Sequence, residues 1–466
     1  MTVRQSTLNW LQAIVPVIGG HILALVLCGG LLIAVATGRT ICWEYLDQQA
    51  ITGLAAIAWV YAGIGLPLSL LTAAIARRLW VSFAAAAIVP LLLCGALSVS
   101  IAQLLADYEA TLIGRAEFRQ ADLSRTDDGW RVDLRLGIAP ATTDSAAVAE
   151  LLSLCRCLGN VTELEIRDLP NLEEVVLVDL PDLRQAVFWG NRALARLHMD
   201  RLPALQELSI MGAEALEDLA IPDLPALTQL TLRWNHALRW LEIPRLESLT
   251  YLSIGQNDEL VILRIASQPV LEELHIFGQD LIRAFGLQAL PALRRLRVSN
   301  NDGITSWAMP IFPALEEAEI RHNHGLQTLV IPPQPSLRSL DISRHSQLET
   351  LRIARLDTLV SLRLEQLRPL QDLELPRMDA LQILIVDSNF DLQRLSVPPL
   401  PSLRRLAVRE NRVLRRLEIS SADVARVLES FGHNDSPSLV STCPPNDVNI
   451  CLVRQYCDPL VYRCGR

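Results

Sequence analysis

A strict repeat of 11 residues constrains this chain more than any other feature. It runs from Val161 to Val424, 24 times, without one insertion or deletion. Each unit begins L-x-x-L-x-I/L/V, as in Leu205–Ile210, and neighbouring units end differently, so the true period is 22 residues. A fixed period of this length predicts a solenoid, in which each turn packs only on the turns next to it.

Each unit contains the pattern of a strand with one buried face. The fourth and sixth residues are apolar and alternate with polar ones. One 22-residue turn buries about six apolar side chains, at ~1.5–3 kcal/mol each before the ordering entropy is subtracted. Stability must therefore come from stacking between turns, and the ends need caps. Because both long sides are strands, we expect a nearly straight, flattened prism, ~50–60 Å long for about a dozen turns.

The two kinds of unit differ at their ninth residue. One kind ends in a leucine-proline or a relative of it, as in Leu224-Pro225. The other places an asparagine there, and an amide at a corner can bond backbone groups that are unpaired where strands end. Gln279 and His345 can substitute in part, whereas Ala213 and Leu367 cannot. We interpret the column as a structural ladder made of Asn191, Asn235, Asn257, Asn301, Asn323, Asn389 and Asn411.

The residues that carry this period resemble the leucine-rich repeat. The segment Leu249–Asn257 matches L-x-x-L-x-I-x-x-N at every position. The second half of the turn, such as Leu216–Leu224, repeats the strand pattern, which is similar to a bacterial class whose units contain two similar halves. The resemblance covers residues 161–424 and implies a solenoid fold and a propensity to bind. It implies no particular ligand, because the positions that choose one vary.

Residues 1–106 contain three long uncharged stretches, Trp10–Thr37, Ala50–Ala76 and Leu79–Ala106. Each exceeds the ~20 residues that cross a bilayer as a helix. The alternative is a cleaved signal peptide followed by a buried helical hairpin. The Arg77–Arg78 pair between the second and third stretches favours a cytoplasmic N-terminus. We therefore expect a bacterial inner-membrane protein whose repeats are periplasmic.

Caps are expected on both sides of the repeats. Residues 107–160 read as a juxtamembrane linker and N-terminal cap, with a strand over Trp130–Leu136 and an amphipathic helix over Ala146–Leu158. Beyond the repeats, Ala422–Phe431 is predicted to be a matching helix. Residues 425–466 read as a C-terminal cap.

The C-terminal cap holds four cysteines whose spacing fits no zinc pattern. An even number in so short a tail predicts disulfides formed in an oxidising compartment. Four cysteines allow three connectivities, and the sequence does not choose among them. The candidates are Cys443, Cys451, Cys457 and Cys464.

Exposed positions of the asparagine-class strands are the candidate binding residues. Clustered exposed aromatic side chains are typical of a binding patch. The alternative is that they stack on one another to support the sheet. The arginines of the later turns, next to acidic residues, are interpreted as solvated ion pairs. The candidates are Trp189, Met211, Arg233, Trp234, Tyr251, His275, Phe277, Arg295 and Arg297.

Motifs of catalysis are absent from the sequence, so no catalytic residue, metal or cofactor is predicted. Arg321–His324 offers two histidines without a third ligand nearby. The net charge of −9 argues against general nucleic-acid binding. All 42 basic residues are arginine, which indicates a GC-rich bacterial genome.

The sequence as a whole predicts a membrane-tethered recognition protein that binds a protein, peptide or envelope ligand on the exposed strands of its repeats. Two alternatives stay open. One is an accessory or scaffold subunit of a membrane transport or signalling complex, and the other is a secreted virulence factor displayed in a host membrane. The sequence does not decide the oligomeric state.

Overall fold

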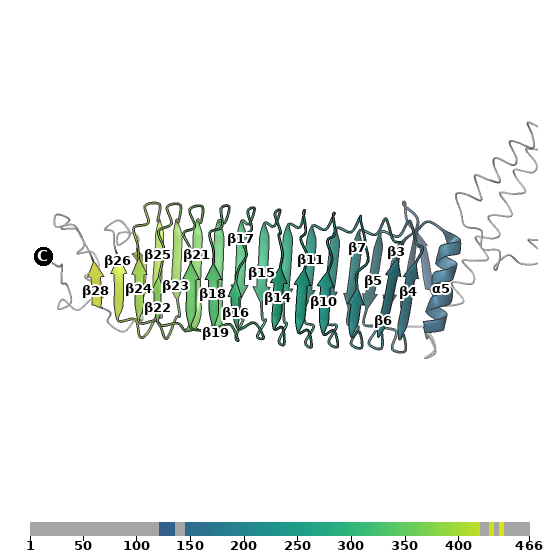
Figure 1. Cartoon of the computed structure of the whole chain (residues 1–466), viewed down its shortest axis with the longest axis horizontal. Coiled ribbons are helices and arrows are strands. Elements are labelled where there is room, and N and C mark those ends of the chain that lie inside the picture. The colour runs from purple at the N-terminus through teal and green to yellow at the C-terminus, as the bar shows by residue number, and fades with distance from the viewer. Residues whose placement is uncertain (1–120, 136–144, 420–427, 433–437, 442–466) are drawn as a thin grey trace, which may run out of the picture. The chain divides into compact units, whose positions relative to one another are not determined.

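The computed structural model describes residues 121–135, 145–419, 428–432 and 438–441 (Figure 1). The three uncharged stretches and the four C-terminal cysteines lie outside these residues. Within the described part of the chain, no helix is long and apolar enough to cross a membrane. The chain divides into two compact units, residues 1–132 with 150–161, and residues 133–149 with 162–466.

The segment before the repeats contains two strands and one helix. Strands β1 (Ala121–Arg125) and β2 (Trp130–Arg135) are neighbours in a sheet, and Thr126 N donates to Gly129 O at 2.8 Å in the turn between them. Helix α5 (Ser145–Leu158) follows. Strand β2 and helix α5 lie where the alternating and amphipathic patterns predicted them.

The repeats form a parallel β-solenoid of about a dozen turns. Successive strands of each side pair in register with the residue 22 positions further on, as in Leu252↔Leu274. In the second unit, Figure 1 shows the strands of these turns stacked side by side. The long sheet contains β3 (Val161–Arg167), β5 (Gln185–Trp189), β7 (Glu207–Met211), β9 (Gln229–Arg233), β11 (Tyr251–Gly255), β13 (Glu273–Phe277), β15 (Arg295–Ser299), β17 (Glu317–Arg321), β19 (Ser339–Leu348), β21 (Ser361–Pro369), β23 (Ile383–Asp387), β25 (Arg405–Arg409) and β27 (Leu428–Gly432).

The opposite side of the solenoid is divided into shorter sheets, because its strands are only three to five residues long. They are β4 (Glu174–Val178) with β6 (Arg196–Asp200); β8 (Asp218–Ala220), β10 (Trp240–Ile243), β12 (Ile262–Ile265) and β14 (Ala284–Leu287); β16 (Ser306–Ala308), β18 (Thr328–Ile331) and β20 (Thr350–Ile353); and β22 (Asp372–Glu374), β24 (Arg394–Val397), β26 (Arg416–Ile419) and β28 (Ser438–Ser441).

The core is a column of leucines and isoleucines between the two sides. In the turn that begins at Leu249, the first, fourth and sixth residues of the unit, Leu249, Leu252 and Ile254, are all fully buried. This alternation follows from the strand pleat, which sends successive side chains to opposite faces. Within the strand, the fourth and sixth residues therefore point into the core and the third and fifth lie on the outward side, while the first residue, just before the strand, also packs inward.

The predicted helix over Ala422–Phe431 was wrong at its C-terminal end. Leu428–Gly432 forms strand β27, in which Leu428 pairs with Leu406, 22 residues earlier. Strand β28 pairs with β26 at the same spacing, as in Ser438↔Arg416. Unpaired backbone groups at the end of a sheet favour one more strand, and this outweighs the local helical pattern.

Candidate ligand-binding face

One backbone feature recurs at the corner after each strand of the long sheet from β3 to β25. The residue just before the asparagine column has a positive φ throughout. Its N–H donates to a carbonyl of the next turn, as from Gly190 to Met211 O at 2.8 Å. The left-handed residues are Asp168, Gly190, Gly212, Trp234, Gln256, Gly278, Asn300, His322, Arg344, Gln366, Ser388 and Glu410.

The asparagine side chains complete this corner. All seven asparagines of the column are buried. Asn257 is representative: its Oδ1 accepts from Asn235 N at 3.0 Å, and its Nδ2 donates to Leu232 O at 3.3 Å. Its own carbonyl accepts from Leu260 N at 3.0 Å. Each amide therefore joins its turn to the preceding one.

Five other residues stand in this column between Leu169 and Asn411, and they differ in what they can bond; Leu169, at its start, has no polar side-chain atom. His345 directs Nδ1 to Asn323 O and Nε2 to Ile320 O, at 3.1 and 3.0 Å. Burial lowers the pKa of His345, while its hydrogen bonds to these two carbonyls act in the opposite direction. Gln279 donates within its own turn, to Phe277 O at 3.1 Å. Ala213 and Leu367 have no polar side-chain atom to offer.

A second set of buried amides lies at the opposite, leucine-proline corner, and the sequence analysis missed it. Gln268 accepts from Leu246 N at 3.0 Å and donates to Pro244 O at 2.6 Å. Gln334 accepts from Phe312 N at 2.9 Å and donates to Pro310 O at 2.8 Å. The sequence did contain a signal for these amides. Gln268 and Gln334 are polar residues at the position of the 22-residue repeat where most turns have leucine.

The predicted binding residues all lie on the long sheet or at its corner. Their strands are consecutive neighbours, so the sheet brings together side chains that are far apart in the sequence. Trp189 is on β5, Met211 on β7, Arg233 on β9, Tyr251 on β11, His275 and Phe277 on β13, and Arg295 and Arg297 on β15, while Trp234 follows β9 directly.

Trp189 and Trp234 form an aromatic pair in which Trp189 is exposed and Trp234 is half-buried. Their ring centroids are 5.7 Å apart in an edge-to-face arrangement, and Trp189 is 42% exposed. They meet across β7, where Gly212 approaches so closely that an added Cβ would lie 3.3 Å from Gly190 Cα. Trp234 adopts a φ of 57°, a conformation that costs a bulky residue ~1–3 kcal/mol. The corner therefore stores strain where the indole pair is presented.

Arg233 and Phe277 form a second layer of packing on the outward face. The guanidinium lies over the Phe277 ring, 5.1 Å from its centroid. That ring covers Gly255, because a Cβ built there would lie 2.1 Å from it. Arg233 Nε and Nη2 donate to Ser253 Oγ at 3.2 and 2.8 Å, and Ser253 is fully buried although its strand position faces outward.

Tyr251 and His275 continue this layer. Their rings meet edge to face at 5.4 Å, and the Tyr251 hydroxyl lies 3.5 Å from His275 Nδ1. Burial, then the charges of Arg297 and Arg233, lower the pKa of His275 to about 4. The imidazole is therefore neutral at pH 7, and its 3.8 Å approach to Glu273 is not an ion pair at that pH. This half of the predicted patch packs on itself.

The arginines of the later strands face carboxylates. Arg295 pairs with Glu273, and Arg297 lies 3.6 Å from Glu319. Arg321 contacts Asp341 at 2.8 Å, and Arg363 lies 3.7 Å from the same carboxylate. These pairs neutralise the face beyond β13.

The described residues contain no assembled metal site. No group of three or more His, Cys, Asp and Glu side chains there can hold a metal ion. His322 and His324 meet edge to face with centroids 6.2 Å apart, and Arg344 Nη1 lies 3.0 Å from His322 Nε2. In α5, burial raises the pKa of the Cys155 thiol to about 12, which makes it unreactive.

Comparisons with known proteins give little beyond this geometry. No family model and no curated protein matches the chain. Among solved structures, the chain is similar to a leucine-rich repeat protein from Bacteroides ovatus, with 13% identity over 69% of this chain and 97% of that chain. The TM-score is 0.21, which carries no argument about fold or function. The fold and the proposed function therefore rest on the residues of this chain.

Proposed function

We propose that this chain is a membrane-tethered recognition protein of the nested, 22-residue leucine-rich-repeat class. Its ligand, a protein or peptide, binds on the outward face of the long sheet around Trp189 and Trp234. The in-phase L-x-x-L-x-I-x-x-N pattern and the 22-residue strand register support this class. The uncharged stretches of residues 1–106 support the tether, and the role assigned is binding without catalysis.

The observation that carries the binding face is the indole pair made by exposed Trp189 and half-buried Trp234. Exposed tryptophans supply large contact areas, and they are enriched among residues that dominate binding energy. The parallel strands around the pair fix its position before any ligand arrives.

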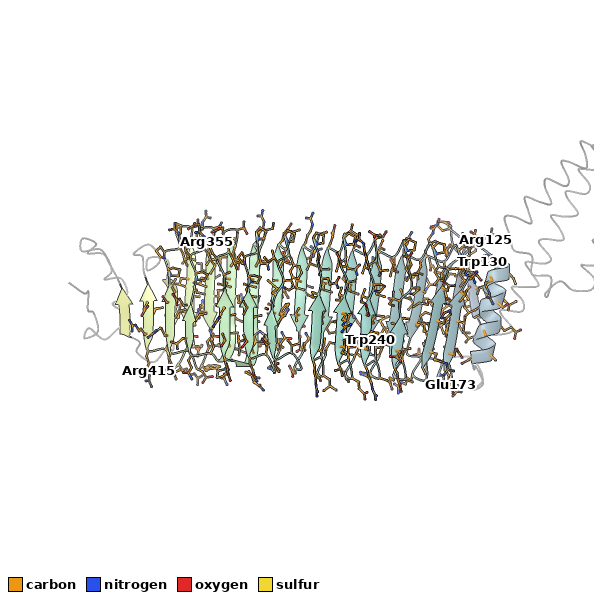
Figure 2. The ribbon with its side chains drawn as sticks, in the orientation of Figure 1. Arg125, Trp130, Glu173, Trp240, Arg355 and Arg415 are labelled. Atoms are coloured by element: carbon orange, nitrogen blue, oxygen red, sulfur yellow. The ribbon has the colours of Figure 1, made fainter. Side chains whose placement is uncertain are left out.

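The test places a photo-crosslinking amino acid at Met211, between the two tryptophans, in cells that make the protein. A discrete adduct is expected, and it should disappear when Trp189 and Trp234 are both changed to Ser. The matched control is Trp240→Ser, because Trp240 is 48% exposed on β10 of the opposite side and is labelled in Figure 2. An adduct that survives the double change, or that Trp240→Ser removes equally, would contradict this face.

A further inference from the structure

Arg233 differs from the arginines that surround it on the long sheet. Arg295, Arg297, Arg321 and Arg363 each have a carboxylate oxygen within 4.0 Å. Arg233 has no such ion pair among the described residues. The face therefore carries one half-buried positive charge that the protein itself does not neutralise.

The structure nevertheless holds the Arg233 side chain in one place. Ser253 Oγ accepts from Nε and Nη2, and the Phe277 ring lies beneath the guanidinium. These contacts occupy one edge and one face of the group. They leave the other edge, formed by Nη1 and the second N–H of Nη2, for a ligand. A guanidinium that is already ordered loses less side-chain entropy when a ligand binds.

The residues around Arg233 indicate which chemical groups the ligand has. On the C-terminal side lie Tyr251 and His275, whose lowered pKa of about 4 keeps its imidazole neutral at pH 7, while Arg297 is paired with Glu319. On the N-terminal side, Met211 lies opposite Arg233 in register, and Trp189 lies opposite Met211. One uncompensated charge thus stands directly beside an apolar, indole-bearing surface.

We propose that Arg233 binds a carboxylate of an extended acidic peptide whose neighbouring apolar side chain packs on Trp189, Met211 and Trp234. This inference rests on the proposed recognition function and names the ligand's chemistry. From Trp189 to Phe277 there are four strand spacings of about 4.8 Å, a span covered by about six extended residues. The peptide lies across the strands, along the solenoid.

The geometry favours a single carboxylate on a peptide over other anions. One free guanidinium edge matches one planar carboxylate, and the local excess of a single positive charge does not match a doubly charged phosphate. The edge-to-face indoles cover one ring face with the edge of the other ring. This arrangement forms an angled surface that suits an apolar peptide side chain. A sugar ring, by contrast, stacks on one flat aromatic face.

The experiment selects a phage-displayed library of random hexapeptides on the purified full-length chain, and separately titrates the chain with tri-galacturonic acid, an acidic saccharide. Wild type is expected to enrich Asp or Glu beside Phe, Trp or Leu. Replacing the acid of the best peptide by its amide should weaken binding by about tenfold or more. The Arg233→Met variant should select peptides without acidic residues and bind the acid and the amide equally.

The matched control is Arg363→Met, because Arg363 is on the same sheet but is paired with Asp341 and Glu365. It should keep the acidic selection, and circular dichroism establishes that both variants fold. Hexapeptides enriched without acidic residues, or an acidic preference that survives Arg233→Met, would overturn the inference and leave the recognition function standing. Enrichment of no peptide, together with binding of the saccharide, would overturn both.

Discussion

At the residue scale, the asparagine column joins the turns by replacing missing backbone partners. Asn257 is fully buried, and it binds two backbone groups of the preceding turn: it accepts from the N–H of Asn235, which lies beyond the end of β9, and donates to the carbonyl of Leu232. A buried polar group without a partner costs free energy, so the amide is needed wherever the chain turns this corner. Ala213 offers no such group, and its own N–H is bonded only by Asn235 of the next turn.

Asn257→Ala is predicted to lower the free energy of unfolding by about 1–3 kcal/mol, since it leaves the buried N–H of Asn235 without its acceptor. Urea unfolding followed by circular dichroism measures this. The control is Gln371→Ala, at an exposed side chain, where a change within ~0.5 kcal/mol is expected. If the two substitutions changed the free energy of unfolding equally, the asparagine column would have no structural role.

At the element scale, strands β9, β11 and β13 support a layer of side chains outside the core. The missing side chain of Gly255 on β11 creates the space that the Phe277 ring of β13 fills, and Arg233 of β9 reaches across it. An aromatic ring laid over a glycine on a neighbouring strand restores the packing that the glycine lacks. Three consecutive strands thus act as one unit in positioning the guanidinium.

Gly255→Ala is predicted to displace the Phe277 ring and to destabilise the protein by about 1–3 kcal/mol. The measurement is a double-mutant cycle with Phe277→Ala, in which the cost of the new methyl group should vanish. Gly286→Ala is the control, because an added Cβ there meets no atom within 4 Å. A cost of Gly255→Ala that persists without the ring would show that the backbone, and not Phe277, needs the glycine.

At the scale of the whole molecule, the repeats and the apolar N-terminal stretches are joined in one chain. Three membrane spans with Arg77–Arg78 in the cytoplasm would place the repeats on the other side of the membrane. Periplasmic exposure would also bring the four C-terminal cysteines into an oxidising environment. The proposed binding face would then meet ligands of the cell envelope.

An alkaline phosphatase fusion after Arg466 is predicted to be active in bacterial cells, because the enzyme folds only when it is exported. A fusion after Arg78 is the matched control and should be inactive. Immunoblotting establishes that both fusions are intact. An inactive, intact fusion after Arg466 would place the repeats in the cytoplasm, and a span would have been miscounted.

The sequence by itself determined the features that repeat. The period of 22 residues predicted which residues pair across turns, and strand alternation predicted which side chains enter the core. Both are set by local backbone geometry, so each turn specifies them independently. The helix now seen at Ser145–Leu158 was also readable from its own segment.

Only the tertiary structure decided the contacts that do not repeat. The binding of Arg233 to Ser253, the Phe277 ring over Gly255 and the neutral state of His275 depend on side chains one or two turns apart. Strand β27 likewise formed because a neighbouring strand offered unpaired backbone groups, against the helical pattern of its own segment. These outcomes depend on the particular neighbours that stacking brings together, and a period carries no information about them.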